Sequence, residues 1–180
     1  MIIIFAIAIV AIICVYYINR IIILSNRIDN ALSQIDVQLK KRADLVPNLI
    51  ETVKGYVKHE KNTIRMVTEA REKMLGATTI KERAKAENVL SRALKTVFAL
   101  AENYPKLRAN ENFKLLQEQL EGIESKIAYS RQFYNDSVLR FNNMISTIPG
   151  SWFASTMGKK VTREYFEVAE EERKPIKVKF

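Results

Sequence analysis

The side chains best suited to covalent or metal chemistry are scarce in this chain. Cysteine and histidine occur once each, as Cys14 and His59. Nucleophilic catalysis needs a nucleophile with a base in reach. Cys14 lies in an apolar N-terminal run, and His59 is flanked by charged residues near a predicted turn. One cysteine and one histidine are also too few for a zinc site. The sequence therefore predicts neither a nucleophile–base pair nor a metal centre.

Phosphate-binding and acid–base chemistry have no distinct signal either. The five glycines are isolated, so the chain has no glycine-rich phosphate loop. Asp and Glu are plentiful, but they stand among Lys and Arg at helical spacing, which is typical of a solvated, ion-paired helix face. Two carboxylates could meet across helices as an acid–base pair, but nothing marks which two. We expect a protein that is not an enzyme and holds no cofactor.

The most unusual polar cluster is "RADLVPN", residues 42–48. Steps of seven along the apolar pattern lead from Ile35 to Arg42 and then to Leu49, so Arg42 takes a core-facing position. An unpaired buried arginine is strongly unfavourable. We therefore expect a partner carboxylate from a facing helix.

Three neighbours of Arg42 complete this cluster. Asp44 is two residues away and points to another face, so it is not the natural partner. Pro47 removes a backbone hydrogen bond and collides with the carbonyl of Ala43, which predicts a bend. Asn48 could bond the freed carbonyl or another helix. Two interpretations stay open: a polar register lock inside a helical bundle, or a recognition spot at a bend.

Residues 1–24, "MIIIFAIAIVAIICVYYINRIIIL", read as a membrane anchor. No charged side chain precedes Arg20, and the run has the length of about 20 apolar residues that spans a bilayer. Tyr16 and Tyr17 lie where an aromatic belt is expected, and Arg20 can reach the interface. A cleaved signal peptide is the rival interpretation, but the basic start and the small-x-small cleavage site are missing.

The basic residues near this span all follow it, beginning with Arg20 and Arg27. The positive-inside rule then places the body in the cytoplasm and a very short N-terminus outside.

From residue 26 onward, apolar side chains recur at helical spacing. We expect long helices over about 26–57, 60–75, 79–102 and 110–148, the first of them continuous with the anchor. Thr79 and Glu82 have the spacing of a capping box, and Gly76 is a candidate helix stop. The predicted fold is all-α: an N-terminal transmembrane helix and an antiparallel bundle of three to four long helices. The predicted domains are the anchor, 1–24, the bundle, 25–148, and a cap segment with a charged tail, 149–180.

The net charge of +9 raises the question of an anionic partner. The excess is spread along the chain, with only a modest concentration in residues 61–105. A nucleic-acid binder would show a dense basic stripe interleaved with aromatic residues. We therefore expect no nucleic acid among the partners.

The segment "SWFASTMG", residues 151–158, carries aromatic side chains and no charge. It could cap the end of the bundle. Alternatively, Trp152 and Phe153 could contact the membrane interface, with Lys159 and Lys160 beside anionic headgroups. Glu170–Glu172 belong to a tail that is predicted to be loose or to be a segment for a partner.

Two long motifs carry a resemblance to a known family. They read "IDVQLKKRADLVPNLIETVKGYVKHE" (35–60) and "AENYPKLRANENFKLLQEQLEGIESKIAYSRQFYNDSVLRFN" (101–142), and "YFE" (165–167) and "VKF" (178–180) follow. In these motifs the chain resembles the LemA family of bacterial membrane proteins over nearly its whole length. The second motif adds Asn112, Tyr134 and Asn135 as candidate structural or interaction residues. The departure lies at residues 147–158, where the family usually has a Phe-Pro-Ser stretch and then an aliphatic segment containing Gly-Phe.

The resemblance implies a single-pass anchor in the cytoplasmic membrane, a cytoplasmic helical bundle and no enzyme activity. Relatives are associated with the cell envelope: one branch serves magnetosome membrane formation, and others are encoded beside a membrane metalloprotease of the HtpX type. We therefore expect a scaffold or adaptor whose partners are the bilayer, through residues 1–24, and further copies of itself or another membrane protein. A lipid-binding or membrane-shaping module, or a protease modulator, is the alternative.

Overall fold

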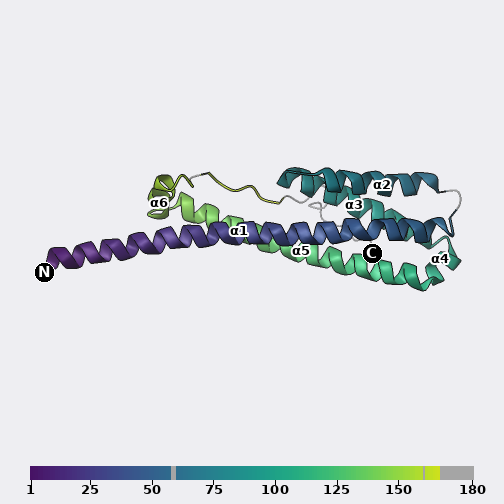
Figure 1. The fold of residues 1–180 in the computed structure, drawn as a ribbon, viewed down its shortest axis with the longest axis horizontal. Coiled ribbons are helices and arrows are strands. Elements are labelled where there is room, and N and C mark those ends of the chain that lie inside the picture. Colours follow the sequence, from purple (N-terminus) through teal and green to yellow (C-terminus); the bar gives the residue numbers. More distant parts are fainter. Residues whose placement is uncertain (58–59, 160, 167–180) are drawn as a thin grey trace, which may run out of the picture. The chain divides into compact units, whose positions relative to one another are not determined.

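The computed structural model describes residues 1–57, 60–159 and 161–166. Within them every regular element is a helix (Figure 1). The helices are α1 (Ile2–Lys54), α2 (Lys61–Gly76), α3 (Ile80–Ala101), α4 (Pro105–Ala109), α5 (Glu111–Ser146) and α6 (Gly150–Thr156). The predicted all-α fold is confirmed. The apolar N-terminal segment and the first bundle helix form one helix, α1, as the apolar pattern indicated.

Local sequence signals set the starts of the two helices α3 and α5. The Thr79 hydroxyl accepts a hydrogen bond from the Glu82 N–H, and the Glu82 carboxylate accepts one from the Thr79 N–H, which confirms the predicted capping box. The Asn110 side chain accepts a bond from the N–H of Phe113 at the start of α5. These caps satisfy backbone donors that have no partner within the helix.

The predicted stop at Gly76 is confirmed, because Gly76 is the last residue of α2, although its φ is not positive and the helix does not end in the left-handed conformation. One boundary prediction was wrong. Residues 105–109 form the short helix α4, where the sequence suggested only a connection. Pro105 starts that helix, because proline lacks only an N–H that the first turn does not use.

Close contacts divide the chain into two compact units, and the dividing points fall inside α1 and α5. The first unit contains Met1–Gln34 and Ser130–Tyr165. Of the described residues, the second contains Ile35–Tyr129 and Phe166. The domain boundaries predicted at residues 24 and 148 rest on composition and stay a prediction.

The core of the second unit comes from the apolar stripes of α1, α2, α3 and α5. Consecutive long helices run in opposite directions there, with α2 beside α3 (Figure 1). A fully buried aliphatic or aromatic side chain contributes about 1.5–3 kcal/mol to stability. Short α4 and the segment after α6 contribute as well, and the largest fully buried side chains of the unit are Phe113, Phe166, Ile35, Leu49, Leu90, Leu94, Leu107 and Leu120.

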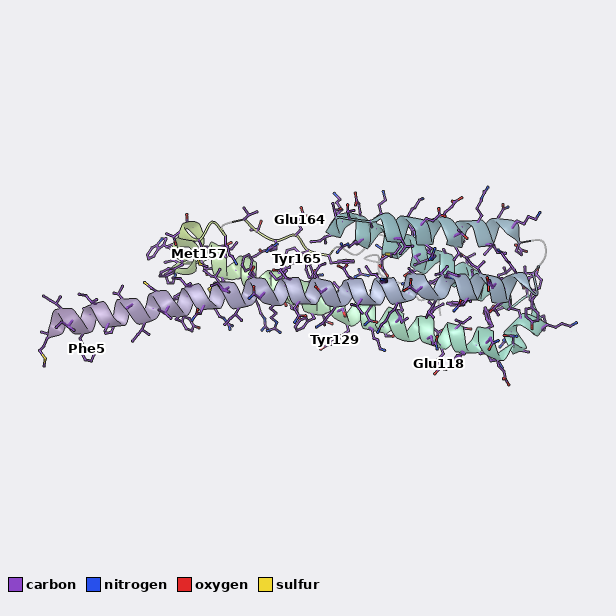
Figure 2. The ribbon with its side chains drawn as sticks, in the orientation of Figure 1. Phe5, Glu118, Tyr129, Met157, Glu164 and Tyr165 are labelled. Atoms are coloured by element: carbon purple, nitrogen blue, oxygen red, sulfur yellow. The ribbon has the colours of Figure 1, made fainter. Side chains whose placement is uncertain are left out.

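The first unit contains an apolar stretch with no protein cover. An 18-residue window of α1 has a mean hydropathy of 2.7, and none of it is buried. Phe5, for example, is 74% exposed and projects from bare helix (Figure 2). Further along α1, Ile21, Leu24 and Ile28 are buried. The described chain therefore has one candidate membrane span, as its length and apolar composition require.

Candidate functional site

Arg42 is buried in the second unit, at 4% exposure, and meets polar groups from two other helices. Its Nη1 donates to the Ser91 hydroxyl at 2.7 Å and to Glu87 Oε1 at 3.3 Å, both on α3. The same nitrogen forms an ion pair with Glu124 on α5. The expected carboxylate from a facing helix is confirmed, and there are two of them.

The four residues Arg42, Glu87, Ser91 and Glu124, here called the arginine network, connect α1, α3 and α5. The Ser91 hydroxyl lies 3.0 Å from Glu87 and 3.2 Å from Glu124, so its single proton can be donated to either carboxylate. Glu87 is 2% exposed and Glu124 is 41% exposed. Among the described residues, the Arg42 Nε has no hydrogen-bond partner. Sliding any of the three helices would separate these charges, so the network fixes their register.

A second arginine replaces the backbone hydrogen bond that Pro47 removes from α1. Proline has no N–H, so the Ala43 carbonyl, four residues earlier, loses its helical donor. Arg71 of α2 supplies the missing bond, with its Nε 2.9 Å from that carbonyl oxygen. The chain of α1 stays helical through Pro47. The sequence suggested Asn48 for this role, but Asn48 is exposed, and the donor comes from another helix.

Arg71 had a detectable signal in the sequence. It lies four residues after Val67 and three before Met74, both of which are buried. That spacing places an arginine at the edge of the apolar stripe of α2. A charged residue at such a position is a candidate for a bond to a neighbouring helix.

The other candidate interaction residues are separated from the arginine network. Asp44, Asn48 and Asn112 are exposed. Tyr134 and Asn135 belong to the first unit, where Asn135 is half-buried. The Tyr134 hydroxyl donates to the Glu164 carbonyl at 2.9 Å, and burial raises the pKa of this phenol. These residues do not make one site.

The candidate membrane-interface residues lie partly together in the first unit. Tyr17 packs edge-on against Tyr16, with ring centroids 5.3 Å apart. On its other side Tyr17 stacks on Phe153 of α6, at 5.5 Å with the planes 11° apart. This stack places α6 beside the end of the apolar stretch. Arg20 is exposed. Trp152 is 63% exposed, so packing on the end of the bundle does not explain an aromatic side chain at this position.

Two lysines complete the candidate interface. Lys159 is half-buried, and its backbone N–H donates to the Ala154 carbonyl. Lys160 lies outside the described residues, as do His59, Glu170–Glu172 and the final "VKF".

The chemistry of the arginine network suits a structural role, the connection of helices. Its hydroxyl has no histidine within the network to activate it, and one guanidinium is shared between the two carboxylates. Nowhere in residues 1–57, 60–159 and 161–166 do three or more His, Cys, Asp or Glu side chains form a group that could hold a metal.

The fold and the site together define a class: a helical bundle locked by buried charges and continuous with one candidate membrane span. The model of the LemA family matches residues 31–180, which is most of the chain. The protein belongs to the LemA family. No curated protein matches the chain.

Proposed function

We propose that this protein is a non-enzymatic, membrane-anchored scaffold or adaptor of the bacterial cell envelope. The observation that carries the proposal is α1: its uncovered apolar end leads without a break into a bundle locked by the arginine network. An anchor confines the bundle to two dimensions and so raises its effective concentration for partners in the same membrane. The partner is a further copy of the chain or another membrane protein.

The proposed location is the cytoplasmic membrane, crossed once, with the bundle in the cytoplasm. The support is the set of basic side chains that follow the span, among them Arg20, Arg27, Lys40 and Lys41. Modulation of a membrane metalloprotease would be one form of this adaptor role.

The experiment is a photo-cross-linking scan of the full chain in its own membrane, with the probe at single positions along 40–57 and 148–159. We expect products with the same chain or with one defined membrane protein. A probe at Leu90, which is fully buried, is the control for contacts inside the bundle. If every exposed position yields only monomer and nothing co-purifies, the scaffold proposal fails.

A second candidate function is binding or shaping of an anionic membrane surface. Trp152 supports it, because an exposed indole beside the stacked Tyr17–Phe153 pair has the composition of an interfacial anchor. Lys159 would face the headgroups.

Trp152 is the only tryptophan, so its fluorescence reports on α6 alone. In this second function, brominated lipids quench Trp152 in proteoliposomes of the full chain, and they quench it more in anionic than in neutral bilayers. Lys159→Glu should reduce the difference, and salt should do the same. Equal emission with brominated and ordinary lipids at low salt would exclude this function.

A further inference from the structure

The end of α5, the connection after it and α6 form an uncharged corner of the first unit, residues 143–158, here called the corner. No charged side chain occurs between Arg140 and Lys159. Phe153 of the corner stacks on Tyr17 of α1, with ring centroids 5.5 Å apart. The corner therefore lies beside α1 at the level of Tyr17, where the bare end of α1 begins (Figure 1).

The level of Tyr17 is inside the candidate membrane span. The span is an 18-residue window of α1, and α1 begins at Ile2, so the window reaches at least Asn19. Tyr17 lies about 4.5 Å before Arg20, the first charged side chain, at about 1.5 Å per residue. Cys14 is already half-buried, whereas residues 1–13 are all exposed. The protein thus covers one side of α1 to a depth of about 9 Å beyond Arg20.

The side chains that the corner exposes are ones that hydrocarbon tolerates. Ile148 is 71% exposed and Trp152 is 63% exposed, although both are large and apolar. The exposed side chains of Thr147 and Thr156 are polar, but each hydroxyl donates to a backbone carbonyl of its own turn at 2.8 Å. These two hydroxyls therefore have a partner without water.

Backbone donors are paired where α6 begins and where it ends. The Ser151 N–H donates to the Thr147 carbonyl at 2.8 Å. The Met157 N–H donates to the Phe153 carbonyl at 3.1 Å. Hydrocarbon requires such pairing, because it contains no water to satisfy a bare N–H.

Polar and basic groups return at the border of the corner. The Asn142 amide donates to the Arg163 carbonyl at 3.0 Å, and the Asn142 Oδ1 accepts from the Arg163 N–H at 2.9 Å. Arg140 is exposed just before this point, and Lys159 follows the corner directly. An uncharged segment with basic residues at both borders suits entry into a membrane, because the basic side chains can meet anionic headgroups.

We propose that the corner is inserted beside α1 among the acyl chains of the leaflet that faces the bundle. Its partner is lipid hydrocarbon, and Arg140, Lys159 and Arg163 lie at the level of the headgroups. The inference rests on the proposed membrane anchor, and it deepens the second candidate function, in which Trp152 contacts the membrane surface. A single span can tilt in the bilayer, whereas a second inserted element fixes the tilt of the first unit.

Thiol labelling of the full chain in opened membranes tests whether the corner is covered, in a Cys14→Ala background. Ile148→Cys should react with a water-soluble maleimide about tenfold more slowly than Leu139→Cys, because hydrocarbon disfavours the reactive thiolate. Leu139 is the matched control, since it is aliphatic and 48% exposed but precedes the corner. Both variants should react fully once the chain is unfolded in detergent. Equal rates in membranes would overturn the insertion.

Quenching of Trp152, the only tryptophan, shows whether lipid is the cover. In proteoliposomes of the full chain, brominated acyl chains should quench Trp152 more strongly than aqueous iodide does. Most of this quenching should persist in neutral bilayers and at high salt, because α1 rather than charge holds the corner in place.

The control for quenching moves the indole out of the corner, with Trp152→Phe and Tyr165→Trp together. Tyr165 is 43% exposed and belongs to the first unit. The Tyr134 hydroxyl holds the neighbouring Glu164 at a level about 12 Å before Asn142 along α5. Iodide should therefore quench this indole more strongly than brominated chains do.

The contrary outcomes separate the proposals. Quenching by brominated chains only in anionic bilayers at low salt would support surface binding and refute the insertion. Protection of Ile148→Cys without quenching by brominated chains would show that protein, such as a second copy, covers the corner, and would also refute the insertion. Absence of both protection and quenching would exclude the insertion together with the second candidate function, while the scaffold proposal would still depend on the photo-cross-linking scan.

Discussion

Arg42 is tolerated in the core of the second unit because two carboxylates face its charge. Replacing it with methionine leaves Glu87, at 2% exposure, without the guanidinium. We expect Arg42→Met to lower the free energy of unfolding by about 3–5 kcal/mol, the usual cost of breaking a buried ion pair. Urea denaturation of the full chain in detergent, followed by circular dichroism, measures this change.

The matched control removes the buried carboxylate as well. The double variant Arg42→Met with Glu87→Met should recover much of the loss, because an apolar replacement of a whole buried pair is often neutral. Glu124 can stay charged, since it is 41% exposed. A double variant as unstable as Arg42→Met would show that packing, rather than charge, sets the effect.

Arg71 donates a hydrogen bond to the Ala43 carbonyl oxygen, which has no helical donor because Pro47 lacks an N–H. Arg71→Met should destabilise the chain by about 1.5–3 kcal/mol, the range for hydrogen bonds to charged groups. In a Pro47→Ala background the restored N–H bonds Ala43 itself, so the same substitution should cost less. A double-mutant cycle in urea measures the coupling. Equal costs in the two backgrounds would mean that Arg71 acts through other contacts.

At the scale of elements, the turn from α5 into α6 depends on Gly150. A Cβ on this residue would lie 2.1 Å from the Met144 carbonyl oxygen, which is backbone and cannot rotate away. We expect Gly150→Ala to destabilise the first unit by about 1–3 kcal/mol, as overpacking does. Thermal unfolding and the Trp152 emission should both change. Gly76→Ala is the control, because a Cβ there meets nothing and should be harmless.

The start of α3 responds to pH through its capping box. Backbone N–H groups of Thr79 and Thr78 donate to the Glu82 carboxylate and lower its pKa from 4.5 to about 2. A carboxyl group whose pKa is lower in the folded state stabilises the fold above its unfolded value, and this contribution disappears as the pH falls toward 2. An NMR titration of Glu82 should therefore show a pKa near 2. Glu82→Gln should lack this pH-dependent part, and a titration near 4.5 would contradict the capping box.

Elements were predicted well from the sequence where the signal is local. The apolar rhythm gave α1, α3 and α5, and Thr79 with Glu82 gave a helix start, because capping involves residues three apart. The short α4 was not predicted, because Pro105 is a signal both for the end of one helix and for the start of the next.

For the arginine network, only the need for a partner carboxylate was predicted. The spacing shows that Arg42 faces the core, but which helix faces Arg42 depends on packing. For the same reason only the neighbouring Asn48 was considered as a donor to the Ala43 carbonyl, and Arg71, 28 residues away, was not.

At the scale of the whole molecule, the candidate membrane span could be predicted from the sequence, because length and hydropathy suffice to recognise it. The structure adds continuity, since one helix carries both the candidate span and a wall of the bundle.

The proposed orientation makes a prediction about the entire chain. In a Cys14→Ala background, a cysteine at the exposed Lys106 should react with a membrane-impermeant maleimide in inverted membrane vesicles and not in intact cells. The reason is the basic side chains that follow the span, which hold that flank in the cytoplasm. Inserting lysines ahead of Ile2 while replacing Arg20 and Arg27 with glutamine should move the label to the outside in a fraction of molecules. Labelling of the Lys106→Cys chain in intact cells would place the bundle outside, and any partner would then have to be sought there.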